Sequence, residues 1–168
     1  VQPPLASRPQ DSIRTTCIVT CYNYERFVRS ALQSALSQSL PFEEIIVIDD
    51  GSTDSSWPII QSLAEQDGRI KAIRHTQNAG QLAAFESGFA AAQGEIIFFL
   101  DADDVYSRGY HEAALSVYKS SPNCTFLYCN PFHFTNENEL PPPAQQTRNA
   151  RSEISACQSS ALSFFDAL

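Results

Sequence analysis

Three acidic side chains follow an apolar segment in the middle of the chain. Residues 96–100 read IIFFL, and Asp101, Asp103 and Asp104 come within four positions of them. Crowded carboxylates repel one another, so one of them holds a proton unless a cation lies among them. Oxygen ligands suit Mg²⁺ or Mn²⁺, and a site with few protein ligands leaves coordination positions for phosphate oxygens. The pattern predicts a divalent metal ion at Asp101, Asp103 and Asp104 that holds an anionic diphosphate.

Two further apolar segments end in polar residues. Thr20, Tyr22 and Asn23 close the segment TCIVTCYN, and Asp49 and Asp50 close the segment EEIIVIDD. In an open parallel sheet, ligands bind in the crevice at the carboxyl ends of the strands. We therefore expect a ligand near these residues. The alternative is that the aspartates only cap turns and helices, as loop carboxylates often do.

Strands and helices alternate along the chain with short connections, which predicts an α/β fold with a mostly parallel central sheet flanked by helices. The unbroken apolar run of EEIIVIDD predicts burial on both faces of its strand. Leu82, Phe85 and Phe89 lie on one face of the helix after Gly80, and Gly94 is expected to cap its C-terminus. Strands are expected at residues 16–20, 43–50, 70–75, 96–100 and 125–130, and a last helix at residues 154–168.

The composition argues against several classes of protein. A chain of 168 residues with 43% hydrophobic content suits one domain with a single core. A net charge of -8 without clustered Lys and Arg argues against a nucleic-acid partner. No segment approaches the roughly 20 apolar residues of a membrane span. The five cysteines lack the spacing of a zinc site and are expected to stay reduced in the cytosol.

The segments CIVTCYNYERFVRSALQSALSQSLPFEEIIVIDDGSTD and NAGQLAAFESGFAAAQGEIIFFLDADD, in this order, resemble the family-two glycosyltransferases of the GT-A fold. The resemblance covers about residues 15–130. It implies the GT-A type of nucleotide-diphospho-sugar transferase fold and the transfer of a sugar from such a donor, with inversion at the anomeric carbon. The expected donor is a UDP-sugar, the expected cofactor Mg²⁺ or Mn²⁺, and the expected acceptor a saccharide or lipid-linked molecule. Cell-envelope polysaccharide biosynthesis is the expected setting.

The resemblance also implies roles for single residues. Thr20 and Tyr22 match positions that contact the nucleobase, Tyr22 by stacking on it, and Asp49 matches the acid that reads the base edge. Asp101 and Asp103 match the DxD positions that meet the ribose and the metal-bound diphosphate, with Asp104 beside them as an alternative ligand. Asn23, Asp50, Gly80 and Ala102 are further expected nucleotide contacts.

The chain departs from the family pattern in two places. Cys21 stands where the family usually has Pro. The inverting mechanism also needs a carboxylate base for the acceptor hydroxyl, which in the family lies in a later, acceptor-binding half. Beyond Glu112 the only carboxylates are Glu137, Glu139, Glu153 and Asp166, and none fits that pattern. We therefore expect the acceptor half to be truncated and identify no catalytic residue.

The expected organisation is a flexible segment at residues 1–14, a nucleotide-sugar-binding domain at residues 15–130, and a loop or linker with the terminal helix at residues 131–168. A cytoplasmic location is expected, at the inner face of the membrane if parts of a parent protein anchor it there. The oligomeric state stays open.

Three other functions remain as alternatives. The first is a binding module or fragment that holds nucleotide sugar without transferring it. The second is the receiver domain of a response regulator, because IIVIDDG resembles the acidic pair of such domains. A receiver also requires a Lys late in the chain, and no Lys follows Lys119. The third is a nucleotidyltransferase, but the Gly-rich basic loop expected near the first strand is missing from VTCYNYERF.

Overall fold

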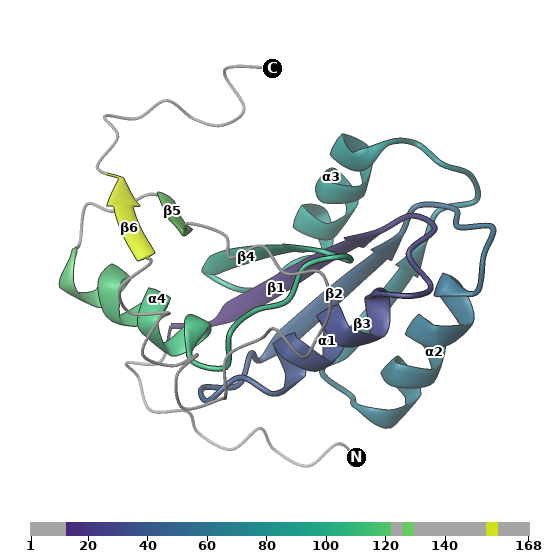
Figure 1. The fold of residues 1–168 in the computed structure, drawn as a ribbon. Coiled ribbons are helices and arrows are strands. Elements are labelled where there is room, and N and C mark those ends of the chain that lie inside the picture. The colour runs from purple at the N-terminus through teal and green to yellow at the C-terminus, as the bar shows by residue number, and fades with distance from the viewer. Residues whose placement is uncertain (1–12, 122–125, 130–153, 158–168) are drawn as a thin grey trace, which may run out of the picture. The chain divides into compact units, whose positions relative to one another are not determined.

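The computed structural model describes residues 13–121, 126–129 and 154–157 (Figure 1). Its contacts divide the chain into two units, residues 1–32 with 42–104 and residues 33–41 with 105–168. Among the helices of the described ranges, none is long and apolar enough to cross a membrane.

The first unit contains a sheet of four strands in the order β3-β2-β1-β4, and all neighbouring strands are parallel. Every residue of β1 is buried, and so are five of the six residues of β2. The predicted parallel sheet, with a second strand buried on both faces, is therefore confirmed. The strands are β1 (Thr15–Cys21), β2 (Glu44–Asp49), β3 (Ile70–Arg74) and β4 (Ile96–Asp101).

Helices connect the strands, as expected for a parallel sheet. They are α1 (Val28–Leu36), α2 (Ser56–Gln66) and α3 (Gln81–Ala91), and α2 and α3 cover opposite faces of the sheet (Figure 1). Ile46 and Ile48 of β2 pack against Ala84 of α3. Because side chains alternate along a strand, Val47 and Asp49 point to the other face.

The face of α3 that carries Leu82, Phe85 and Phe89 is not the face that is buried. The side chains of Leu82 and Phe89 are 48% and 49% exposed, whereas Ala84 and Gly88 are buried. A Cβ atom added to Gly88 would lie 2.6 Å from Cγ2 of Ile18 in β1. The helix therefore approaches the sheet through its smallest residues, and this close approach leaves two large apolar side chains outside.

Gly94 does not cap α3, contrary to the prediction. The helix ends at Ala91 and its C-cap is Ala92, which has an extended conformation. A Cβ atom at Gly94 would lie 2.6 Å from the backbone nitrogen of Thr16. Gly94 is therefore required because the chain entering β4 passes directly beside the backbone of β1.

We expect Gly88→Ala to lower the free energy of unfolding by about 1–3 kcal/mol, the usual cost of inserting a methyl group into a packed core. This loss should outweigh the helix propensity gained, about 1 kcal/mol. Urea unfolding of Gly68→Ala provides the control, since a Cβ atom there meets nothing within 4 Å. A Gly88→Ala variant more stable than the parent would show that α3 does not depend on this close approach.

The second unit contains α4 (Tyr110–Ser120) and an antiparallel pair formed by β5 (Phe126–Cys129) and β6 (Ile154–Cys157). Residues 154–157 are therefore a strand, not the start of the predicted last helix, because they pair with β5. The rest of that predicted helix lies outside the described residues. Nδ1 of the buried His111 donates a hydrogen bond to the Leu40 carbonyl oxygen at 2.7 Å, which joins residues 33–41 to α4.

Candidate functional site

The carboxyl ends of β1, β2 and β4 lie side by side. Thr20 of β1 is the register partner of Asp101 in β4, and Cys21 is the partner of Asp49 in β2. β1 lies between the other two strands, an order that their sequence does not reveal. The three polar strand ends therefore meet at one edge of the sheet, where parallel α/β proteins bind ligands.

Asp101 is held by one residue that the sequence singled out and by one that it did not. The Thr20 hydroxyl donates to Oδ1 of Asp101 at 3.0 Å, and the side-chain amide of Gln81 donates to the same oxygen at 3.2 Å. Gln81 is the first residue of α3. In the sequence, Gln81 is visible only as a polar residue just after Gly80. Nothing in this local pattern predicts its contact with Asp101.

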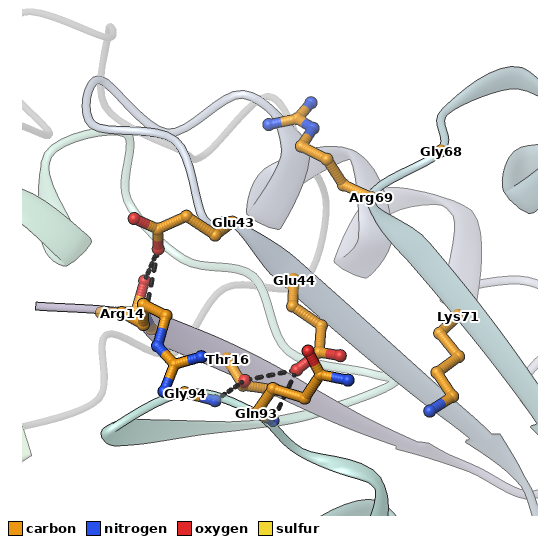
Figure 2. A pocket seen from close by; sticks show the side chains of 10 residues that line it. Arg14, Thr16, Glu43, Glu44, Gly68, Arg69, Lys71, Gln93 and Gly94 are labelled. Carbon is orange, nitrogen blue, oxygen red and sulfur yellow. Dashed lines mark hydrogen bonds between the residues drawn. The ribbon is translucent and has the colours of Figure 1, made fainter. Parts of the chain in front are cut away.

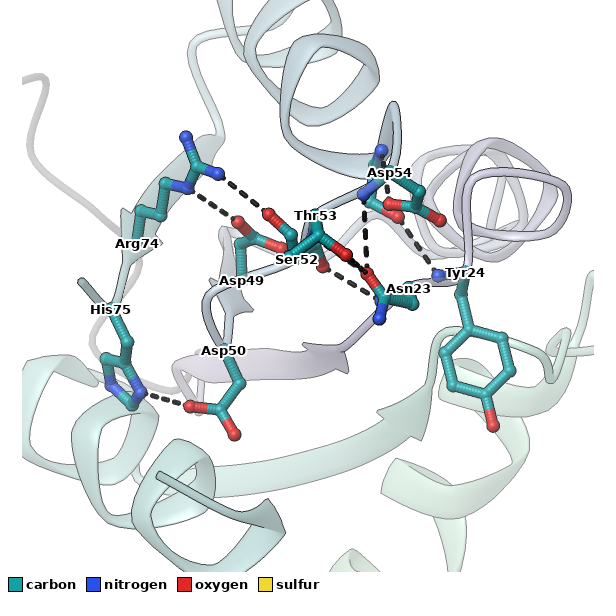
Figure 3. Close-up of polar contacts among 10 residues, drawn as sticks. Asn23, Tyr24, Asp49, Asp50, Ser52, Thr53, Asp54, Arg74 and His75 are labelled. Atoms are coloured by element: carbon teal, nitrogen blue, oxygen red, sulfur yellow. Dashed lines mark hydrogen bonds and ion pairs between the residues drawn. The ribbon is translucent and has the colours of Figure 1, made fainter. Parts of the chain in front are cut away.

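Asp50 is anchored by the loop that leads into α3. The N–H of Ala79 donates to its Oδ1 at 2.9 Å and the N–H of Gly80 to its Oδ2 at 2.8 Å. Nδ1 of His75 lies 2.6 Å from Oδ1 (Figure 3). The Asp50 side chain is only 5% exposed. Burial alone would raise the pKa of this carboxyl, but the hydrogen bonds from Ala79, His75 and Gly80 outweigh burial and lower the pKa.

Gly80, the predicted nucleotide contact at the start of α3, has a φ of 92°. This backbone conformation favours glycine. It allows the Gly80 N–H to turn toward Asp50. Gly80 therefore connects the loop before α3 to the Asp50 carboxylate. His75 extends the connection, because its Nε2 lies 2.8 Å from the Ser87 hydroxyl of α3.

Asp49 points to the opposite face of the sheet and is completely buried. Nε of Arg74 lies 3.0 Å from its Oδ2, although neither Asp49 oxygen has a hydrogen bond of good geometry within the described part of the chain. Arg74 also donates to the Ser52 carbonyl at 2.9 Å and lies over the Trp57 ring. Asp49 is paired with Arg74 in this arrangement (Figure 3), and its predicted role in reading the base edge stays a prediction.

Asn23 joins the loops that follow β1 and β2. Its φ is 58°, a left-handed conformation that Asn tolerates better than most residues. Its Oδ1 accepts hydrogen bonds from the N–H groups of Thr53 and Asp54 at 2.8 and 3.4 Å, and its own N–H donates to the Ser52 hydroxyl at 2.9 Å (Figure 3). Asn23 therefore positions the loop after β2, and its predicted contact with the nucleotide stays a prediction.

Two tyrosines of the same loop are exposed. Tyr22, the predicted stacking residue, is 42% exposed, which leaves its ring accessible. Tyr24 is a residue that sequence reasoning missed: its hydroxyl hydrogen-bonds to Asp103. The negative charge of Asp103 is the main cause of the raised pKa of Tyr24, followed by burial and by that hydrogen bond. Tyr24 therefore contacts Asp103 beside the strand ends.

The turn after β4 presents the predicted metal ligands. The N–H of the buried Ala102 donates to the Thr20 carbonyl at 3.1 Å, and the N–H of Asp104 donates to the Asp101 carbonyl at 3.0 Å. The side chains of Asp103 and Asp104 are exposed. No three His, Cys, Asp or Glu side chains of the described ranges converge well enough to hold a metal ion between them.

The oxygen donors at this edge still fit Mg²⁺ or Mn²⁺. Mg²⁺ is usually bound through one or two carboxylates together with phosphates and water, and does not need an all-protein cage. Asp103 can supply one exposed carboxylate, and Asp101 has one oxygen beyond the Oδ1 that Thr20 and Gln81 occupy. The metal prediction for these residues stays a prediction.

A cavity of about 420 Å³ lies at the other end of the sheet, by the amino ends of the strands (Figure 2). Its polar groups are largely used within the protein: Glu43 accepts from the Thr15 hydroxyl at 2.7 Å and Glu44 from the Thr16 hydroxyl at 2.6 Å. The predicted residues are absent from its lining. It is lined by Arg14, Thr15, Thr16, Glu43, Glu44, Gly68, Arg69, Lys71, Gln93 and Gly94.

The parallel sheet with helices on both faces is the fold of GT-A glycosyltransferases. The structure of the mannosyltransferase PcManGT from Pyrobaculum calidifontis, in complex with GDP-Man and Mn²⁺, matches with a TM-score of 0.63 and 26% identity over 73% of this chain and 37% of that one. The crystal structure of S. aureus TarS (residues 1–349) in complex with UDP shares the fold, with a TM-score of 0.64 and 23% identity over 77% and 38% of the two chains.

The sequence profile of glycosyl transferase family 2 matches residues 16–166, and the chain belongs to this family. An uncharacterized glycosyltransferase of Nostoc sp. is 42% identical over 110 residues, which are 65% of this chain and 34% of that protein. The chain spans about a third of the length of the curated relatives it matches. The resemblance read from the sequence and the expected GT-A fold are both confirmed.

Proposed function

We propose that this chain is the donor-binding part of a glycosyltransferase that moves a sugar from a nucleotide diphosphate to a saccharide or lipid-linked acceptor, with inversion. Membership of glycosyl transferase family 2 supports the class of reaction. Structural neighbours in complex with UDP, UDP-GlcNAc and GDP-Man support a nucleotide-sugar donor. We propose UDP as the nucleotide of this donor.

The observation that carries the proposal is the meeting of three strand ends at one edge of the sheet. Thr20, Asp101 and Asp50 come from three strands or their ends, and the start of α3 contacts both acids. Polar groups from several strands at this edge are the usual setting of a nucleotide site in an open α/β sheet. A turn cap would involve only residues close together in the sequence.

We propose that Asp103, with Asp101 or Asp104, binds Mg²⁺ or Mn²⁺ together with the diphosphate. The cation would neutralise the charge that develops on the departing diphosphate. The mannosyltransferase neighbour that contains Mn²⁺ supports metal use in this fold. The residues of this chain would bind the donor, while Tyr24 would keep Asp103 in place.

A second function, a module that binds nucleotide sugar without transferring it, is favoured by one observation. The chain covers only about a third of its curated relatives. The carboxylates beyond Glu112, namely Glu137, Glu139, Glu153 and Asp166, lie outside the described residues. Donor binding is common to both functions and is therefore the property to test first.

Thermal unfolding of the chain with UDP, GDP and dTDP, each with Mn²⁺ or with EDTA, tests the proposal. Mn²⁺ with UDP should raise Tm by about 5–10 °C at a ligand concentration of 100 times Kd, from mass action and the size of the chain. UDP in EDTA should leave Tm unchanged. If no nucleotide raises Tm under either condition, the proposed function is wrong. Equal shifts with Mn²⁺ and EDTA would refute only its metal dependence.

A further inference from the structure

The first turn of α3 connects two acids that belong to different strands. The Gly80 N–H donates to Asp50 at 2.8 Å, and the side chain of the next residue, Gln81, donates to Asp101 at 3.2 Å. Asp50 follows β2 and Asp101 ends β4, and β1 lies between these two strands in the sheet. The first turn of α3 therefore contacts the side chains of both acids.

The two oxygens of Asp101 differ in their surroundings. Oδ1 accepts hydrogen bonds from Thr20 and from Gln81. Oδ2 has no hydrogen-bond partner among the contacts of the described residues, and Asp101 is only half-buried. Two donors on one oxygen restrict rotation of the carboxylate and leave the other oxygen for a ligand. Thr20 lies on a buried strand, whereas Gln81 is exposed at the start of a helix.

We propose that Gln81 is a positioning residue for the donor: its side-chain amide orients Asp101 so that Oδ2 meets the diphosphate and its cation. The inference rests on the proposed function and adds to it a residue to which the sequence analysis assigned no role. Gln81 acts through Asp101 and needs no contact of its own with the nucleotide. A hydrocarbon of similar size at position 81 would fill the same space but would leave Asp101 with the Thr20 hydroxyl alone.

The alternative role for Gln81 is a direct contact with the nucleotide. The two roles differ in how they respond to the metal. If Gln81 orients a carboxylate that meets the cation, its loss weakens Mn²⁺ binding in the nucleotide complex, and more Mn²⁺ compensates by mass action. If Gln81 contacts the nucleotide itself, the affinity for UDP stays low even when Mn²⁺ saturates the protein.

The experiment is calorimetric titration of UDP into the chain and into Gln81→Leu, at limiting and at saturating Mn²⁺. At limiting Mn²⁺ we expect Gln81→Leu to bind UDP about tenfold more weakly, a loss typical of one hydrogen bond to a charged group. At saturating Mn²⁺ the affinity should return to that of the parent chain. Gln61→Leu, which changes an exposed glutamine of α2, is the matched control and should bind like the parent.

The outcomes separate the inference from the proposed function. If the parent chain binds UDP and Gln81→Leu binds equally well at limiting Mn²⁺, Gln81 does not position Asp101. A loss that persists at saturating Mn²⁺ would also overturn the inference, in favour of a direct contact or a disturbed fold. If the parent chain itself binds no nucleotide, the proposed function fails, and the inference fails with it.

Discussion

Asp103→Ala is expected to remove Mn²⁺-dependent binding of UDP while the protein stays folded. Asp103 is exposed in the turn after β4, so its replacement leaves the core intact. Removing a residue that hydrogen-bonds to a metal ligand typically lowers the metal affinity about 10- to 100-fold. Removing a ligand itself should lower it at least as much. A residue that only capped a turn or helix would instead cost about 0.5–2 kcal/mol of stability. Calorimetry and urea unfolding on the same samples measure both quantities.

Glu65→Ala is the control for the loss of one negative charge, because Glu65 is an exposed residue of α2, remote in sequence from the turn after β4. It should bind UDP as the parent chain does. If the folded Asp103→Ala variant retains the parent affinity, or if EDTA leaves that affinity unchanged, then Asp103 does not hold a metal ion for the donor.

Sugar transfer by this 168-residue chain alone is expected to be slow or absent, even where the donor binds. Losing general-base assistance typically lowers a rate by about 10²–10⁴-fold. An acceptor that the chain does not position would also lack orientation, which supplies about 7–11 kcal/mol of barrier reduction in well-aligned reactions. Slow hydrolysis of the donor by water is the activity that should survive. The chain spans about a third of its curated relatives, which is the reason for this expectation.

A radiolabelled UDP-sugar, incubated with a panel of saccharide and lipid-linked acceptors, measures transfer and hydrolysis together. A version of the protein extended by about a hundred residues, an ordinary domain length, is the comparison. Rapid transfer by the short chain would contradict the expectation. Single replacement of Glu137, Glu139, Glu153 and Asp166 by the corresponding amides would then identify which of these carboxylates acts as the base.

The parallel sheet was predictable because its signal is local. Apolar runs such as residues 45–48 have to be buried on both faces, and short helical segments between such runs leave few alternatives to parallel strands. The acids at the ends of these runs were also visible in the sequence. Period-two alternation already places Asp49 and Asp50 on opposite faces of the sheet.

The face of α3 could not be predicted from the size of its apolar residues. Periodicity assumes that large side chains are buried, and it selected Leu82, Phe85 and Phe89. The helix instead packs through Ala84 and Gly88, because Ile18 occupies the space beside Gly88. That choice depends on how closely two backbones approach, which is a property of the assembled layers.

The sequence by itself determined that this protein has a parallel sheet with acids at the carboxyl ends of its strands. Only the tertiary structure decided what each acid contacts. Arg74 pairs with Asp49, His75 with Asp50, and Gln81 with Asp101. These partners are 20 or more residues away from the acids along the chain. They meet because strand order and register bring them together, and no local pattern contains that information.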